Sequence, residues 1–251
     1  MKQFLLLVST LFLLVSCATK KQIIYFQDTE GLSNQENPLK FEPVIENNDV
    51  LHISISSMSR EAVEPFRRKT GLEGNVGNAN PTLQGYLVNS EGTINYPVLG
   101  ALKASGKTRT ELQMELKSKL SEFITDVVVD VRIMNFKVTV LGGVNNPGVY
   151  NISDEQVSLP QALGLAGDLS EDGRRDNIMV IREENGKQAV TRVDLTKTDL
   201  FSSPYYFLKQ NDVVYVEPSL KGVKKSGFIP DVPALLSLFT VVLTSVILIT
   251  R

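Results

Sequence analysis

Tryptophan is absent from this sequence, and cysteine and histidine each occur once, as Cys17 and His52. A single thiol excludes an intrachain disulfide and any zinc site built from several cysteines. His52 stands alone at a polar position of a predicted strand, where a surface histidine is expected rather than a metal ligand. The charges nearly cancel, with 26 Lys and Arg against 28 Asp and Glu, so nothing indicates a nucleic-acid partner. The sequence therefore predicts no cofactor, no metal site and no binding of nucleic acid.

A pair of catalytic carboxylates is also missing. Asp168, Glu171 and Asp172 come closest, but they follow a predicted helix within a turn. A glycosidase needs two carboxyl groups that face each other across a cleft, so a solvated loop is the better interpretation. Gly142-Gly143 lacks the lysine and the helix that a phosphate-binding loop requires. The sequence therefore predicts no catalytic residue, and the protein is not expected to be an enzyme.

The N-terminus has the pattern of a secretory signal. Lys2 precedes an apolar stretch, residues 4–15, that is too short to span a bilayer as a permanent helix. Leu14-Val15-Ser16-Cys17 resembles the bacterial lipobox, in which the cysteine is acylated and becomes the new N-terminus. The only cysteine of the chain stands where that chemistry requires it. We therefore expect a signal peptide over residues 1–16, lipidation at Cys17, and a polar linker through residue 40.

A first β-rich unit, residues 41–135, contains one helix. Residues 50–56 alternate with the period of a half-buried strand, and residues 127–133 form the nearly continuous apolar run of a central strand. Between them, Thr108 and Glu111 form a capping box that begins the helix. The expected core-facing residues of this helix recur every three to four positions: Leu112, Leu116, Leu120 and Phe123.

A second unit, residues 136–218, repeats one element of the first. Asn48-Asp49 and Asn211-Asp212 each precede a valine and an alternating apolar run. This repeat indicates two related units, in each of which an Asn-Asp turn leads into a strand. Ser158 and Gln161 form a second capping box, at the start of a short helix. The adjacent Arg174-Arg175 is expected to be exposed at the surface.

Several stretches, taken in order, resemble the outer-membrane polysaccharide export family: "NNDVLHISI", "GYLVNSEGTINYPVLGAL", "TRTELQMELKSKL", and "VTVLGGVNNPGVY" followed by "LPQALGLAGDL". The first three are similar to the polysaccharide export domain, and the last is similar to a soluble-ligand-binding β-grasp (SLBB) domain. The resemblance implies an α+β fold with these domains in series over residues 41–135 and 136–218. The sequence departs from the family at Asn48-Asp49, where Gly-Asp is common, and at Gly142-Gly143, where Gly-Glu is usual.

After a linker, residues 219–233, the chain has an uncharged apolar run over residues 234–250. As a helix this run is roughly 25 Å long, slightly short of a ~30 Å hydrocarbon core. Either a single membrane anchor or one stave of a helical barrel fits the run. Because an anchor is redundant beside an acylated cysteine, we expect a transmembrane helix that lines a pore. The expected pore-lining residues fall within one narrow stripe: Ser237, Thr240, Thr244 and Arg251.

The resemblance implies one subunit of a homo-oligomeric ring that exports capsular polysaccharide or exopolysaccharide across the outer membrane. The implied partners are an inner-membrane polysaccharide co-polymerase, the polysaccharide as cargo, and outer-membrane lipid. No Asp follows Cys17, unlike in the inner-membrane retention signal of lipoproteins, which favours the outer membrane with the domains in the periplasm. The alternative function is a lipid-anchored periplasmic carbohydrate-binding protein. A periplasmic glycosidase or lyase is disfavoured because it would need the missing carboxylate pair.

Overall fold

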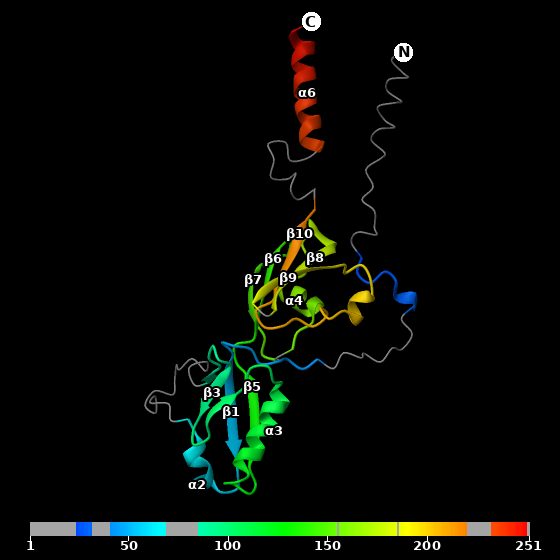
Figure 1. The fold of residues 1–251 in the computed structure, drawn as a ribbon. Helices are drawn as coiled ribbons and strands as arrows, with labels where there is room; N and C mark the ends of the chain where they lie inside the picture. Colours follow the sequence, from blue (N-terminus) through cyan, green and yellow to red (C-terminus); the bar gives the residue numbers. More distant parts are fainter. Residues whose placement is uncertain are drawn as a thin grey trace.

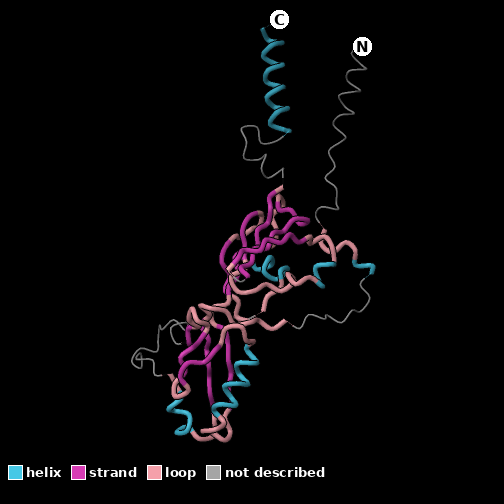
Figure 2. Tube along the Cα trace, viewed as in Figure 1, coloured by secondary structure: helices cyan, strands magenta, loops and turns pink. Residues whose placement is uncertain are grey.

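The structure, a computed structural model, describes residues 24–31, 41–68, 85–154, 156–184, 186–219 and 232–249. Within these ranges, two domains are stacked end to end (Figure 1). Both domains contain strands and helices (Figure 2), so the predicted α+β content is confirmed for the described part of the chain. A final helix, α6 (Val232–Ile249), follows the second domain in sequence.

The first domain is built on an antiparallel sheet with the strand order β2-β1-β5. The strands are β1 (Val50–Ser56), β2 (Tyr86–Leu87) and β5 (Val128–Ile133), and a hairpin adds β3 (Thr93–Tyr96) and β4 (Gly100–Lys103). The helices are α2 (Arg60–Val63), η3 (Glu64–Phe66) and α3 (Arg109–Leu120). The prediction that the apolar run at residues 127–133 is a central strand is wrong, because β1 is central. Only alternate residues of β5 face the core, and the run looks continuous because Val127, buried before the strand begins, adjoins the exposed Val128.

Helix α3 begins where the sequence predicts and ends earlier. The Thr108 hydroxyl accepts the backbone N–H of Glu111 at 3.2 Å, and the Glu111 carboxylate accepts the N–H of Thr108 at 2.8 Å. The three leucines of the predicted stripe are buried. Phe123 is exposed, contrary to the prediction, because the helix ends at Leu120. Its ring contacts Phe66, with 5.5 Å between the ring centroids.

The second domain is built on a five-stranded sheet with the order β7-β6-β10-β8-β9. Strand β10 runs parallel to β6, and the other pairs are antiparallel. Helix α4 begins at the predicted capping box of Ser158 and Gln161 and packs beside β6. The elements of this domain are β6 (Lys137–Gly142), β7 (Gly148–Asn151), α4 (Leu159–Leu165), β8 (Gly173–Glu184), β9 (Lys187–Val193), η5 (Asp199–Ser202) and β10 (Val213–Pro218).

The same turn occurs in both domains where the sequence repeats Asn-Asp. Asn48 and Asn211 have φ of +69° and +64°, in the left-handed region that asparagine tolerates better than most residues. Asp49 accepts the backbone N–H three residues before it at 2.8 Å, and Asp212 does the same at 2.8 Å. Each turn leads directly into a strand, β1 or β10. The prediction of two related units is confirmed at this level of local structure.

The two buried aspartates differ in their surroundings. Arg182, itself buried, donates three hydrogen bonds to the Asp212 carboxylate at 2.6, 3.0 and 3.1 Å and one to the carbonyl of Phe207 at 3.2 Å. Asp49 has no such cation within the described residues. Burial raises the pKa of Asp49 to about 6, and the charge of Glu46 adds to this rise while the Glu46 N–H opposes it.

Breaking the buried ion pair should destabilise the second domain. Asp212→Ala leaves the Arg182 guanidinium buried without its carboxylate, and such a loss costs about 3–5 kcal/mol. Urea unfolding of the full chain in detergent, followed by circular dichroism, measures this change. Asp176→Ala, which breaks the exposed pair with Arg174, is the control and should cost no more than about 1 kcal/mol. Equal losses of unfolding free energy in the two variants would show that the buried ion pair does not stabilise the second domain as expected.

Asp49 should make the stability of the protein depend on pH. Because its pKa is higher in the folded state than in the unfolded chain, the folded protein binds the proton more tightly, and stability falls as pH rises from about 4 to about 6. Asp49→Asn carries no titrating group at this position. The free energy of unfolding of this variant, relative to the unmodified protein, should therefore increase across that window, by at most ~3 kcal/mol. A difference that stays constant between pH 4 and 6 would rule out this role for Asp49.

Candidate functional site

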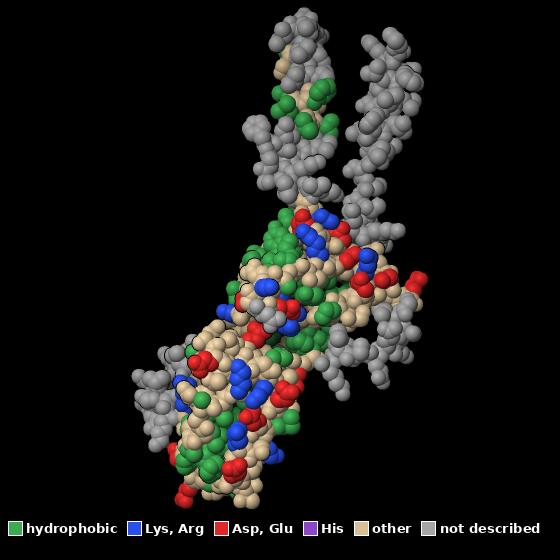
Figure 3. Space-filling model, viewed as in Figure 1, with side chains coloured by type: hydrophobic (Ala, Val, Ile, Leu, Met, Phe, Trp, Pro, Cys, Tyr) green, Lys and Arg blue, Asp and Glu red, His purple; other side chains and the backbone are tan. Residues whose placement is uncertain are grey.

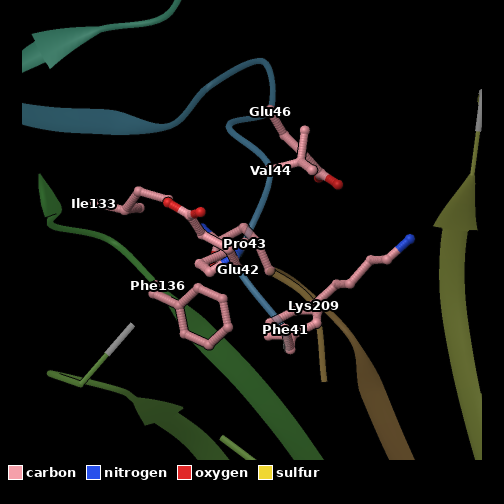
Figure 4. Close-up of a pocket in the computed structure, with 9 residues that line it drawn as sticks. Phe41, Glu42, Pro43, Val44, Glu46, Ile133, Phe136 and Lys209 are labelled. Atoms are coloured by element: carbon pink, nitrogen blue, oxygen red, sulfur yellow. The ribbon is translucent and has the colours of Figure 1, made fainter. Parts of the chain in front are cut away.

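A cavity of about 210 Å³ lies at the junction of the two domains (Figure 4). Phe41 and Pro43 come from the segment that enters the first domain, and Phe136 from the chain that crosses to the second. Lys209 belongs to the turn that precedes β10. The complete lining consists of Phe41, Glu42, Pro43, Val44, Glu46, Ile133, Phe136, Lys209 and Gln210. The cavity is smaller than the ~300–1,000 Å³ of ordinary ligand pockets, and its lining brings no catalytic pair together.

Side-chain amides beside this cavity connect the two Asn-Asp turns. Asn135 accepts the N–H of Val50 at 2.8 Å and donates to the carbonyl of Asn48 at 3.1 Å. Gln210, from the other turn, donates to the carbonyl of Asn135 at 2.8 Å and accepts the N–H of Lys137 at 2.8 Å. These directional bonds fix the crossing segment to both domains. The junction is therefore a structural connection rather than a cleft for chemistry.

The residues weighed as catalytic or metal-binding candidates remain separate. His52 is exposed on β1, opposite Arg132 of β5, as predicted for a surface histidine. Asp168 accepts hydrogen bonds from the hydroxyl of Tyr25 and from the backbone N–H of Leu169, bonds that hold the turn rather than a substrate. Among the residues that the structure describes, no group of three or more His, Cys, Asp or Glu side chains could hold a metal ion.

Residues 24–31, here called the N-terminal strap, are attached to the second domain. Phe26 and Gln27 donate their backbone N–H groups to the carbonyls of Leu195 and Thr196 at 3.1 and 2.7 Å. Asp28 accepts the N–H of Thr198 at 2.8 Å. The strap ends in the short helix η2 (Thr29–Gly31). Within the predicted linker over residues 17–40, this stretch is therefore held in place by main-chain bonds.

Tyr25 anchors the strap between two charged residues. Its hydroxyl donates to Asp168, and the Arg175 guanidinium lies 5.2 Å from the centroid of its ring. Burial and the neighbouring Asp168 together raise the pKa of Tyr25 above its usual range. Arg175 is buried, so the prediction of an exposed arginine is wrong at this position. The strap covers it, and neighbouring sequence gives no signal for a contact with a residue 150 positions earlier.

Helix α6 contains three of the four predicted pore-lining residues. The Thr240 hydroxyl donates to the carbonyl of Ser237 at 2.8 Å, and the Thr244 hydroxyl donates to the carbonyl of Thr240. Ser245, which was not predicted, donates to the carbonyl of Val241 at 2.8 Å. At ~100° per residue, Ser245 is turned about 80° away from Ser237 and lies outside the predicted stripe, beside Leu238. Arg251 and the predicted lipidation residue Cys17 lie outside the described residues.

The side chains of α6 whose exposure is described are all exposed, among them Leu238 and Phe239. Across the described ranges, no helix meets the combined length and hydropathy criteria for a membrane span. The helix has 18 residues. The described part of one chain gives these apolar side chains no surface against which to pack.

The family usually has Gly-Glu where this chain has Gly142-Gly143, and close packing of the backbone explains why no glutamate stands at position 143. Gly142 has φ of +87°, and a Cβ at this position would lie 2.1 Å from the carbonyl oxygen of Val216. A Cβ at Gly143 would lie 2.9 Å from the Cα of Gly173. A glutamate at position 143 would therefore require the backbone to move.

Two family models match the chain over both domains. Residues 38–134 match the model described as polysaccharide biosynthesis/export protein, and residues 136–216 match the SLBB domain. The EPS I polysaccharide export outer membrane protein EpsA of Ralstonia solanacearum is 30% identical over 142 residues, which cover 55% of this chain and 37% of the relative. The protein of the same name from Ralstonia nicotianae is 29% identical over 140 residues, covering 55% and 36%. The chain thus matches little more than a third of the length of these relatives.

The order of the matched models is the order in which the two domains occur along the chain. The family they describe consists of transport components rather than enzymes, in agreement with the lack of a predicted catalytic residue. On the evidence of both models and both relatives, this chain belongs to the polysaccharide export family.

Proposed function

We propose that this protein is an outer-membrane lipoprotein, one subunit of an oligomeric channel that exports capsular polysaccharide or exopolysaccharide. The proposal depends on one combined observation. The chain matches the export family, and its last described helix, α6, is apolar and exposed and has hydroxyl groups along one side. The relatives are named as outer-membrane proteins of polysaccharide export, which supports the location and the cargo. A homo-oligomer is required because one helix cannot enclose a water-filled passage.

The predicted span over residues 234–250 includes most of α6 and crosses the outer membrane in this proposal. Eighteen helical residues extend about 27 Å, and the bacterial outer membrane is thinner than an average bilayer. Leu235 and Leu238, on the other side of the helix at ~100° per residue, face lipid. Ser237, Thr240 and Thr244 face the lumen. The hydroxyl oxygens of the two threonines can accept hydrogen bonds from water although their protons are donated within the helix.

The end of β10 and the attached strap support one orientation of the two domains relative to the outer membrane. Strand β10 ends on the side of this domain that is remote from the first domain (Figure 1). The strap also lies on the second domain, and residues 18–23 can span only about 20 Å between it and the acylated Cys17. The second domain is thus held near the outer membrane after the signal peptide, residues 1–16, is removed. The first domain then points into the periplasm, where an inner-membrane polysaccharide co-polymerase can contact it.

Lipid attachment is tested at Cys17. Cys17→Ser removes the only thiol of the chain, so metabolic labelling with an alkyne fatty acid should disappear. The variant should also keep its signal peptide or leave the membrane fraction. Intact-mass analysis of the purified protein distinguishes these products. Labelling of the variant at the level of the unmodified protein would refute acylation at Cys17.

The channel is tested by single cysteines in α6. Ser237→Cys, Thr240→Cys and Thr244→Cys should react with a bulky water-soluble thiol reagent in intact cells, and the reaction should reduce polysaccharide at the cell surface. The natural Cys17 does not interfere because its sulfur carries lipid. Leu238→Cys and Val242→Cys, on the opposite side of the helix at ~100° per residue, are the matched controls and should not react. Equal protection of both sets, with export unchanged, would leave α6 as an anchor only and favour the carbohydrate-binding alternative.

A further inference from the structure

The outer face of the second domain's sheet is apolar and is not covered by the described residues. The side chains of the core and helix α4 lie on the opposite face. The strand pairings place one residue of each strand in a continuous row across the outer face: Val149, Thr139, Val213, Ile181 and Val190. Four of these five residues are aliphatic, although alternate residues of a one-sided sheet are ordinarily polar.

A second row extends this surface. Leu141, Tyr215 and Met179 lie side by side on β6, β10 and β8, and the row ends at Arg192 on β9. The side chains at the two edges are the most open, with Val149 61% and Val190 57% exposed. Figure 3 shows hydrophobic side chains gathered on the second domain beside β6 and β10. We call these two rows the sheet face.

Polar residues border the sheet face at both ends of the strands. Near the end of β10, Glu217 lies 3.7 Å from Arg174 and 3.6 Å from Arg192 and accepts a hydrogen bond from Asn177. At the other end, Glu183 pairs with Gln188 across β8 and β9. An apolar centre with a polar border is the arrangement of protein–protein interfaces.

The dimensions of the sheet face suit the centre of a contact between proteins. The first row spans five strands about 4.8 Å apart and the second adds three positions about 6.7 Å away, which gives roughly 250 Å² of flat, mainly apolar area. Contiguous apolar patches on monomers rarely exceed a few hundred Å², and those of this size are often functional. A stable interface buries about 800 Å² on each partner, so the border and a second contact, such as α6, would have to contribute the remainder.

We propose that the sheet face binds a second copy of this chain, an inference that rests on the oligomeric channel proposed above. A polysaccharide would need hydrogen-bonding groups, and the centre of the face offers only Thr139 and Tyr215. The face belongs to the domain that the strap and β10 hold near the outer membrane, away from an inner-membrane partner. In a closed ring each copy uses two different surfaces. The sheet face therefore meets the helix side of the next second domain, where Leu165 and Ile24 are exposed.

The double variant Val149→Lys, Val190→Lys tests this contact with little risk to the fold, because both side chains are largely exposed. Val128→Lys, Leu87→Lys is a matched control in the first domain, where the two residues are 60% and 59% exposed. Light scattering of the full chain in detergent should show at least a 10-fold higher concentration for half-assembly of the sheet-face variant, and no change for the control. Equal melting temperatures of the two variants establish that both are folded. An unchanged half-assembly concentration for the sheet-face variant would overturn the proposal.

A photoreactive amino acid in place of Tyr215 identifies the partner surface. The expected product joins two copies of this chain, with the adduct outside the sheet face, on the helix side. An adduct within the sheet face of the second copy would overturn the head-to-tail contact in favour of a two-fold dimer. If the unmodified protein stays monomeric at every concentration in detergent and in lipid, the oligomeric channel itself fails. If it assembles and the variant assembles equally well, only the sheet-face contact fails.

Discussion

The described residues leave apolar surface uncovered within one copy of the chain, and this constraint governs the proposed assembly. Helix α6 exposes leucine and phenylalanine side chains, and the sheet of the second domain exposes two apolar rows. Apolar area contributes about 25 cal/mol per Å² when it leaves water, so both surfaces favour association with lipid or protein. Both surfaces leave water if α6 is one helix of a transmembrane barrel and the sheet face contacts a neighbouring copy.

In the part of the chain that the structure describes, buried polar side chains are almost all hydrogen-bonded, with Nε of Arg175 as the one exception. In each Asn-Asp turn the aspartate carboxylate accepts a backbone N–H, and the buried Arg182 donates to the carboxylate of Asp212. Amides of Asn135 and Gln210 connect the domains, and the strap fixes the N-terminal segment to the second domain. A force on the proposed lipid anchor or on α6 would therefore reach the first domain through defined contacts. Asp49 differs from Asp212 in that its buried carboxyl has no cation beside it among the described residues.

The features that sequence predicted are those whose partners lie a few residues away. Thr108 with Glu111, Ser158 with Gln161 and both Asn-Asp turns are closed by bonds within three residues. The errors concern partners distant in the chain. The place of β5 at the sheet edge depends on which strands pair, and the burial of Arg175 depends on Tyr25, from the strap. The hydroxyl stripe of α6 followed from helical periodicity, whereas its proposed orientation toward a lumen depends on contacts with other copies of the chain.

Imaging of the full-length, acylated protein in outer-membrane lipid tests the central claim most directly. Electron cryomicroscopy of the protein in nanodiscs should show closed rings, with one helix from each subunit crossing the bilayer around an open centre. The second domains should form the layer next to the membrane, each in contact with its neighbours, and the first domains should lie farther out. Single subunits that insert one isolated helix, or that lie on the bilayer with no helix across it, would contradict a channel built from this chain.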